Sequence, residues 1–281
     1  MPELSLSTWE EFESWLAEMK TSHAQSLTGL CFRGQSDASW PLTTTLERRI
    51  RSECQPDTEK TTSSLSLSRV ESFYQLISLI RPQIEIFTDR KWDVPNIAEI
   101  QKFSSEIGEF NKNLSYAELP ALEYLVYLRH HGFPSPLLDW SVSPYVASYF
   151  AFRDPSTSNQ ASIYVFSEMP NNEKFRMSAN PSIYGVGPNI RGHKRHFLQQ
   201  AAYTVCVKYT PTKGWNFTSH ESAFNREQDQ DELWKITIPS TERIKVLKIL
   251  EEHNLNSFSM FGSDESLMET MAIREIDFAV N

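Results

Sequence analysis

The chain has 281 residues, a formal net charge of −9 and a hydrophobic fraction of 40%. This length suffices for one large domain with a substantial core, and the acidic charge disfavours a protein that coats nucleic-acid backbones. The sequence has no apolar run long enough to span a membrane, no signal-peptide pattern and no CxxC pair among its three cysteines. We therefore expect a cytoplasmic protein without a disulfide framework, a zinc site or another metal.

The first half of the chain is predicted to be mainly helical. An amphipathic helix is expected over 7–20, where Ser7 and Glu10 have the spacing of a capping box. A short strand over 30–34 and a helix over 43–50 follow. After a polar loop at 55–68, apolar residues at helical spacing predict helices over 68–80, 83–90, 96–111 and 119–130, with an end or a kink at Pro82.

The second half combines one strongly predicted helix with several strands. Ser143 and Pro144 are a good N-cap and first helical residue, and an apolar helical face follows them. The remaining elements are strands over 161–166, 202–209, 233–238 and 244–250, loops over 167–192 and 211–229, and a helix over 264–276. This order predicts an α+β fold in a single domain, 1–281, with a helical insertion over about 62–130.

Residues 130–144 combine titratable groups with apolar side chains in a stretch rich in glycine and proline. Such a stretch cannot form a regular helix, and it is more typical of a site than of a spacer. The adjacent His130 and His131 lack metal-ligand spacing on a helix, so a structural pair is favoured. Asp139 is either a general base or, as is commoner in turns, an acceptor for backbone N–H groups.

Two basic features attract anions. Arg33 ends an apolar strand beside Gly34, where a guanidinium can hold a phosphate or carboxylate bidentately. The alternative is a buried ion pair, with Asp139 as a candidate partner. The second feature is a basic stretch at 191–196, which is either a solvated surface or a contact for an acceptor molecule.

Three motifs resemble those of the FRG domain family. The first motif consists of Phe-Arg-Gly-Gln at 32–35, Trp-Pro-Leu at 40–42 and Arg48. The second consists of His-Gly at 131–132, Leu-Leu-Asp-Trp at 137–140, Ser-Pro at 143–144 and Tyr-Phe-Ala at 149–151. The third consists of Arg195, Gln199, Ala201 and Tyr-Thr at 203–204. The chain departs from the family pattern at Arg129, where glutamine is common, at 135–136, where Thr-Arg is common, and at Ala201, where glycine is usual.

The order of these motifs also resembles an ADP-ribosyltransferase core, which implies a split β-sheet and NAD as substrate. The resemblance implies a nucleotide contact by Arg33, Gly34, Gln35, Trp140, Ser141, Ser143 and Tyr149. Arg33 would hold the pyrophosphate, the two serines would flank the nicotinamide, and Tyr149 would stack on a ring. The implied acceptor contacts are His130, His131, Arg191, Lys194 and Arg195.

Cleavage of the nicotinamide–ribose bond develops oxocarbenium charge, which a polar or anionic group must stabilise. The implied catalytic residues are Arg33, Gln199 and Asp139. Gln199 stands near the position where the superfamily has a glutamate, and it can orient the ribose 2′-hydroxyl without supplying full charge. Asp139, Glu221 and Glu232 remain alternatives for that charge.

The resemblance implies an NAD-dependent mono-ADP-ribosyltransferase of the bacterial toxin or anti-phage effector type. We expect RNA rather than protein as acceptor, because aromatic stacking can recognise single bases without a basic protein overall. A neutralising antitoxin protein is an expected partner, and a membrane is not. The alternatives are a non-catalytic module that binds a nucleotide or protein, and an NAD glycohydrolase. Arg33→Ala is expected to abolish NAD binding with little loss of stability, unless Arg33 is a buried ion-pair partner.

Overall fold

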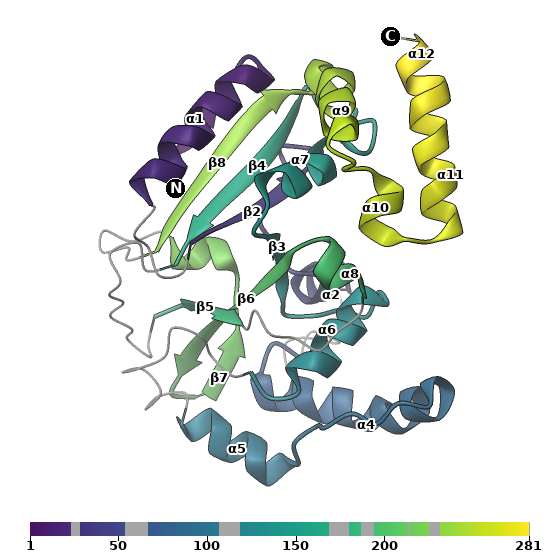
Figure 1. Ribbon diagram of the computed structural model, residues 1–281. Coiled ribbons are helices and arrows are strands. Elements are labelled where there is room, and N and C mark those ends of the chain that lie inside the picture. The colour runs from purple at the N-terminus through teal and green to yellow at the C-terminus, as the bar shows by residue number, and fades with distance from the viewer. Residues whose placement is uncertain are drawn as a thin grey trace.

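The computed structural model describes residues 1–23, 29–53, 67–106, 119–168, 180–186, 194–212, 214–224 and 231–280. It is a mixed α/β structure built around one eight-stranded sheet (Figure 1). The strands are β1 (Glu3–Ser5), β2 (Leu30–Gln35), β3 (Leu138–Ser141), β4 (Gln160–Ser167), β5 (Ser182–Val186), β6 (Ala201–Thr210), β7 (Gly214–Phe217) and β8 (Glu232–Pro239). Their order is β1-β8-β4-β2-β3-β6-β5, and β7 pairs with β6.

Helices surround this sheet (Figure 1). The α-helices are α1 (Trp9–Ser22), α2 (Thr45–Glu53), α4 (Val70–Thr88), α5 (Ile97–Glu106), α6 (Leu122–His130), α7 (Pro144–Phe152), α8 (Lys194–Leu198), α9 (Arg243–Glu252), α10 (Ser257–Phe261), α11 (Asp264–Ala272) and α12 (Phe278–Val280). Shorter turns are η2 (His220–Ala223), η3 (Ser240–Glu242) and the π-type η4 (Ile273–Asp277). Within the described ranges, none of these helices combines the length and apolarity that a membrane crossing needs.

The sheet has two parts that meet at a narrow junction. β2 pairs with β4 along its whole length, from Leu30 to Gln35, whereas β2 and β3 are joined at Phe32 and Ser141. One apolar core lies where α1, α7 and α9 cover the β2–β4–β8 part, and a second lies where α4 and α6 cover the β6 part. A third cluster, in which Leu138 and Trp140 of β3 pack with Tyr164 and Phe166 of β4, joins the two parts beside this junction.

The predicted helix after Ser143 is confirmed. The Ser143 Oγ accepts a hydrogen bond from the Val146 N–H at 3.3 Å, and Pro144 occupies the first turn. The helix predicted over 7–20 is present as α1, but the predicted cap was wrong by one residue. Thr8 is the N-cap and accepts from the Glu11 N–H at 3.3 Å, while the Ser7 N–H donates to the Glu11 carboxylate at 2.7 Å.

The strand predicted over 244–250 was wrong, because this segment lies within α9. Val246, Leu247 and Leu250 are buried at helical spacing and join the core beneath α7. A strand here would have no place beside β8, since β1 and β4 already pair with its two edges. The apolar run alone did not distinguish a buried strand from a buried helix face.

Other predicted boundaries moved. α4 continues through Pro82, so the helix expected over 83–90 is its last part. β5 and β7 form within the predicted loops 167–192 and 211–229, and the very short β1 was missed. The polar loop at 55–68 lies mostly outside the described residues. The helical insertion over 62–130 and the single domain stay predictions.

Candidate active site

A cleft of about 490 Å³ lies at the junction of β2, β3 and β6. It is lined by β2 from Phe32 to Gln35, by β3 from Asp139 to Ser141, and by side chains from α2, α6, α7, α8 and α10. The volume lies within the usual range for small-molecule sites. The cleft therefore brings together parts of all three sequence motifs, although these motifs span more than half of the chain.

Gly34 is required here by the close approach of α7 to β2. A Cβ at this position would lie 1.9 Å from the Ala147 carbonyl oxygen and 2.6 Å from the Ala151 nitrogen. Both are backbone atoms of the helix and cannot rotate away. The glycine of the Phe-Arg-Gly motif therefore fixes the distance between β2 and α7, and with it one side of the cleft.

Arg33 links the two parts of the sheet. Its Nη1 donates a hydrogen bond to the backbone oxygen of Asp139 at 2.8 Å, so the side chain crosses from β2 to β3 beside the narrow junction. Burial and, to a smaller extent, the charges of Arg129 and Arg48 lower the pKa of Arg33 to about 10, although the charge of Asp139 acts in the opposite direction. The alternative considered for Arg33, an ion pair with the Asp139 carboxylate, is replaced by a bond to the main chain of Asp139.

The carboxylate of Asp139 is held by Arg129 instead. The Arg129 Nε lies 3.0 and 2.9 Å from the two carboxylate oxygens, and Nη2 also donates to one of them. Although burial raises the pKa of Asp139, the Arg129 guanidinium outweighs this effect and holds it below its usual value. The expected role as acceptor for backbone N–H groups was wrong. An ionised, paired carboxylate is also a weak general base.

Arg48 adds a third guanidinium to this cluster. It lies on α2, lines the cleft, and makes a single long contact from Nη1 to the Thr43 carbonyl oxygen at 3.4 Å. Burial and the charge of Arg129 lower the pKa of Arg48. Three guanidinium groups thus lie around the carboxylate of Asp139, and with Arg195 and Asp154 the described lining holds four arginines and two carboxylates. Arg48 was not among the predicted site residues. Its membership of the first motif was the sequence signal that could have identified it as one.

Gln199 and Ser141 form the side of the cleft nearest β6. The Ser141 Oγ donates to the Gln199 carbonyl oxygen at 2.8 Å, and the Gln199 Nε2 donates to the Met260 carbonyl oxygen at 3.3 Å. Trp140 lines the cleft but is buried, and its Nε1 donates to the Thr204 Oγ1 at 2.8 Å. The side chain of Gln199 is therefore held between α8 and α10 while it remains at the cleft surface.

Tyr203 connects two histidines beside this side of the cleft. Its hydroxyl lies 3.1 Å from the His130 Nε2 and 3.3 Å from the His196 Nδ1, and burial raises the pKa of the tyrosine. Both His130 and Tyr203 line the cleft. Among the described residues, no group of three or more His, Cys, Asp or Glu side chains is placed to hold a metal ion.

Several expected site residues do not line the cleft. Tyr149 is 1% exposed and packs in the core around α7, so the expected stacking role is wrong, and its neighbour Phe150 faces the cleft instead. Ser143 acts as the N-cap of α7. The other expected residues outside the lining are His131 and Lys194, and Arg191 lies outside the described residues.

The alternative carboxylates also lie elsewhere. Glu221 accepts a hydrogen bond from the Leu42 N–H at 2.8 Å, and Glu232 pairs with His23 at 2.8 Å. Neither belongs to the cleft lining, where Asp139 and Asp154 are the carboxylates that the described residues contribute. The alternatives Glu221 and Glu232 were therefore wrong for a group that must contact the ligand.

The C-terminal helices supply an aromatic side of the cleft. Phe261, at the end of α10, has the Arg153 guanidinium 5.0 Å and the Arg195 guanidinium 5.3 Å from its ring centroid. Its ring also meets Phe150 edge to face at 6.1 Å. Trp40 lines the cleft from the β2 side and is 53% exposed. Sequence reasoning missed Phe261 because its place depends on tertiary docking.

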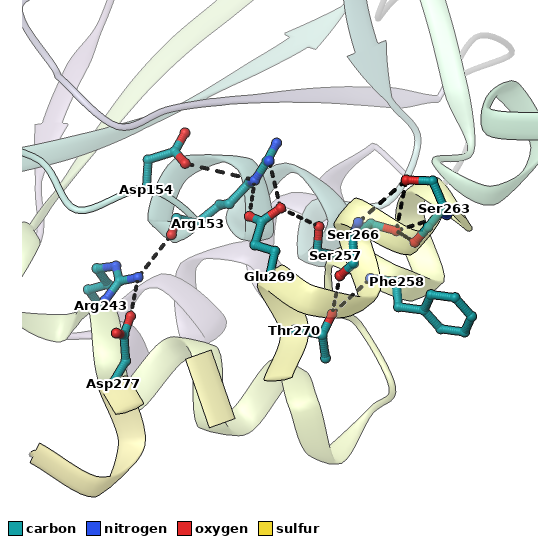
Figure 2. Close-up of polar contacts among 10 residues, drawn as sticks. All are labelled: Arg153, Asp154, Arg243, Ser257, Phe258, Ser263, Ser266, Glu269, Thr270 and Asp277. Atoms are coloured by element: carbon teal, nitrogen blue, oxygen red, sulfur yellow. Dashed lines mark hydrogen bonds and ion pairs between the residues drawn. The ribbon is translucent and has the colours of Figure 1, made fainter. Parts of the chain in front are cut away.

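Ion pairs hold these helices against α7 (Figure 2). The Arg153 Nε and Nη2 donate to the two carboxylate oxygens of Glu269 at 2.5 and 2.8 Å, and the Ser257 Oγ donates to the same carboxylate at 2.7 Å. Arg243 contacts both Asp277 and the Arg153 carbonyl oxygen. Arg153 therefore fixes α11 and α10 at the end of α7, which places Phe261 in the cleft.

Glu269→Gln is expected to lower the free energy of unfolding by about 1–3 kcal/mol, because the partly buried Arg153 loses its bidentate partner and keeps only the longer contact with Asp154. Hydrogen exchange measured by mass spectrometry should increase over 257–272. Glu275→Gln, at an exposed position in the following η4 turn, is the matched control and should change neither measurement. Equal effects of the two variants would contradict the docking role of Glu269.

Comparison with known proteins gives one match. The family model of the FRG domain matches residues 28–160. No curated protein and no solved structure matches the chain significantly. The matched segment contains β2, β3 and α7 and therefore includes Arg33, Asp139 and Gly34. The match supports the FRG resemblance over the part of the chain that carries its first two motifs.

Proposed function

We propose that the cleft binds NAD and that the protein transfers ADP-ribose from NAD to a macromolecule. The observation that carries this proposal is the charge of the cleft. Among the described residues, four arginines, Arg33, Arg48, Arg129 and Arg195, line the cleft together with two carboxylates, Asp139 and Asp154, in a chain whose net charge is −9. A pyrophosphate carries two negative charges, and guanidinium groups bind phosphate oxygens in pairs. The donors therefore match this part of NAD in both charge and chemistry.

The volume and the aromatic side chains of the cleft also suit a dinucleotide. The cleft volume of about 490 Å³ suits a ligand of nucleotide size. Phe150 and Phe261 supply apolar ring surface, and the exposed Trp40 supplies more on the other side. The narrow junction between β2 and β3 is what a split, ADP-ribosyltransferase-like sheet would require, and we propose this fold for the core.

In the proposed reaction the bond between ribose C1′ and the nicotinamide nitrogen breaks, and nicotinamide leaves with the bonding electrons. An acceptor oxygen or nitrogen then forms a bond to C1′ and releases its proton. Gln199 would orient the ribose 2′-hydroxyl. Arg33 would fix the β2–β3 side of the cleft, and Asp139 would contribute negative charge that Arg129 partly neutralises. Such a site has weaker electrostatic stabilisation of the oxocarbenium ion than one with a free carboxylate.

The acceptor is proposed to be RNA rather than protein. Arg195 lines the cleft beside Phe261, and an aromatic ring next to a cation is a suitable surface for a splayed base. A role as a toxin or anti-phage effector, with a neutralising partner protein, follows from the resemblance and is part of the same proposal.

Incubation with NAD labelled on the adenylate phosphate tests the proposal. Label transferred to a cell extract supports the transferase, and its release by RNase or by protease identifies the acceptor class. Free ADP-ribose without labelled macromolecule supports the glycohydrolase instead. Absence of any turnover, together with no rise of the melting temperature on addition of NAD, would contradict the proposal and favour a non-catalytic binding module.

Gln199→Ala is the informative variant in this assay. We expect transfer to fall by roughly tenfold or more, because an oriented hydrogen bond to the reacting ribose is lost. The melting temperature should hardly change, since the side chain makes one hydrogen bond at 3.3 Å. Full activity of this variant would remove Gln199 from the mechanism.

A further inference from the structure

We infer that Arg48 on α2 grips the phosphates of the ligand and that Arg33, the arginine of the Phe-Arg-Gly motif, is a positioning residue. This division of roles rests on the proposed function for the identity of the ligand. The different roles of these arginines are inferred from the contacts that Arg33, Arg48 and Arg129 make. Arg129 is held by a bidentate pair and Arg33 by one short bond to the main chain, whereas Arg48 is exposed and makes one long contact.

Arg33 is tied in place by the protein. Its Nη1 binds the Asp139 carbonyl oxygen at 2.8 Å, and its Nε is buried out of reach of solvent without a hydrogen-bond partner in the described structure. A phosphate that pulled this guanidinium towards itself would break the bridge from β2 to β3. That bridge lies next to the junction at Phe32 and Ser141, so its loss would open the sheet.

Arg129 is engaged in a different way. Both Nε and Nη2 bind the carboxylate of Asp139, and the Arg129 side chain is 14% exposed. A ligand phosphate would have to compete with this bidentate pair. Arg129 therefore contributes its positive charge to the cleft while its donors serve mainly Asp139.

Arg48 combines a fixed backbone with a side chain that is not held tightly. α2 is anchored to the segment before β3, because the Ser135 N–H donates to the Thr45 Oγ1 at 2.9 Å. The side chain of Arg48 is exposed at the cleft, and its one contact, to the Thr43 carbonyl oxygen at 3.4 Å, is long for a hydrogen bond. A guanidinium in this state can turn onto a phosphate without cost to the fold.

Arg48 also gains from an arriving anion. Its charge lies close enough to that of Arg129 to lower its pKa, so the two cations repel each other in the ligand-free cleft. A bound pyrophosphate would replace this repulsion by attraction to both. The neighbouring Arg49 offers a matched control, because it lies on the same helix, is exposed, and is not part of the cleft lining.

The test is to titrate inorganic pyrophosphate into the protein and to measure the binding by calorimetry. The melting temperature of the ligand-free protein is measured in parallel. Arg48→Gln should weaken binding roughly tenfold or more at an unchanged melting temperature, because charge-assisted bonds to the anion are lost. Arg49→Gln should leave pyrophosphate binding unchanged, because Arg49 does not line the cleft. Arg33→Gln should lower the melting temperature by roughly 3–5 °C, with much smaller loss of affinity below that temperature.

Arg33→Lys provides a second variant in case Arg33→Gln does not fold. An ammonium can still donate to the Asp139 carbonyl oxygen, so the melting temperature should recover and pyrophosphate binding should remain. The inference is overturned if wild type does not bind pyrophosphate, if Arg48→Gln binds normally, or if Arg33 variants lose binding at an unchanged melting temperature. It is also overturned if Arg48→Gln and Arg49→Gln weaken binding equally, since only general electrostatics would then be involved.

Turnover of labelled NAD, measured on the same variants, separates this inference from the proposed function. If pyrophosphate binding depends on Arg48 but NAD is not turned over, the anion site is supported and the proposed transferase activity is contradicted. NAD turnover that is insensitive to Arg48→Gln would keep the transferase and reject the role of Arg48.

Discussion

Gly34→Ala is expected to lower the free energy of unfolding by about 3 kcal/mol or more, at the upper end of the range for overpacked cores. The added methyl would lie 1.9 Å from the Ala147 carbonyl oxygen and 2.6 Å from the Ala151 nitrogen. Both atoms belong to the backbone of α7, so the helix as a whole must move away from β2. This helix also carries Val146 and Phe152, which are buried in the core beside α1 and α9.

Gly29→Ala is the matched control for Gly34→Ala. Gly29 has a positive φ of 67°, and no atom lies within 4 Å of the place that its Cβ would take, so alanine there meets a conformational cost without a clash. That cost is about 1 kcal/mol. Chemical denaturation of both variants measures the difference. Similar losses at the two positions would contradict the claim that contact with α7, rather than backbone conformation, requires glycine at position 34.

Arg129→Met should destabilise the protein by about 2–3 kcal/mol at neutral pH, because the Asp139 carboxylate loses the guanidinium to which it is hydrogen-bonded. This value is below that for a fully buried pair, since the Asp139 side chain is 37% exposed and water screens part of its charge. Glu10→Gln removes an exposed pair with Lys245 instead, and it should lower stability much less.

The effect of Arg129→Met should depend on pH in a defined direction. Arg129 holds the pKa of Asp139 below its usual value, so the ion pair contributes fully above the unfolded-state pKa of about 3.9. That contribution is lost as pH falls through the lower folded-state pKa, where the carboxylate becomes protonated. The difference between wild type and variant should therefore shrink from pH 6 towards pH 2, as urea denaturation at several pH values can measure. A difference that does not vary with pH would contradict the ion-pair explanation.

Features set by neighbouring residues were predictable from the sequence. The start of α7 followed from Ser143 and Pro144, because capping and the first helical turn involve residues a few positions apart. The grouping of Arg33, Asp139 and Gln199 at one cleft followed only from motif resemblance. Composition and periodicity do not determine which distant segments of a chain meet.

Features set by tertiary packing were not predictable in this way. Tyr149 and Phe150 are adjacent aromatic residues, and the rotation of α7 against Gly34 decides which of them faces the cleft. Residues 244–250, which lie within α9, are apolar enough for a strand. A strand is excluded there because both edges of β8 are already paired. The partner of Asp139 was likewise set by the position of α6, which places Arg129 beside β3.

The contact between Arg153 and Glu269 has a consequence for synthesis of the protein on the ribosome. The two residues are 116 positions apart, and the ion pair between them holds the helices that place Phe261 in the cleft. Chains are made from the N-terminus, and their parts fold as they emerge. A nascent chain can therefore pair β2 with β4 long before this aromatic side of the cleft exists. The cleft is completed late in translation, so unfinished chains should bind the proposed ligand poorly.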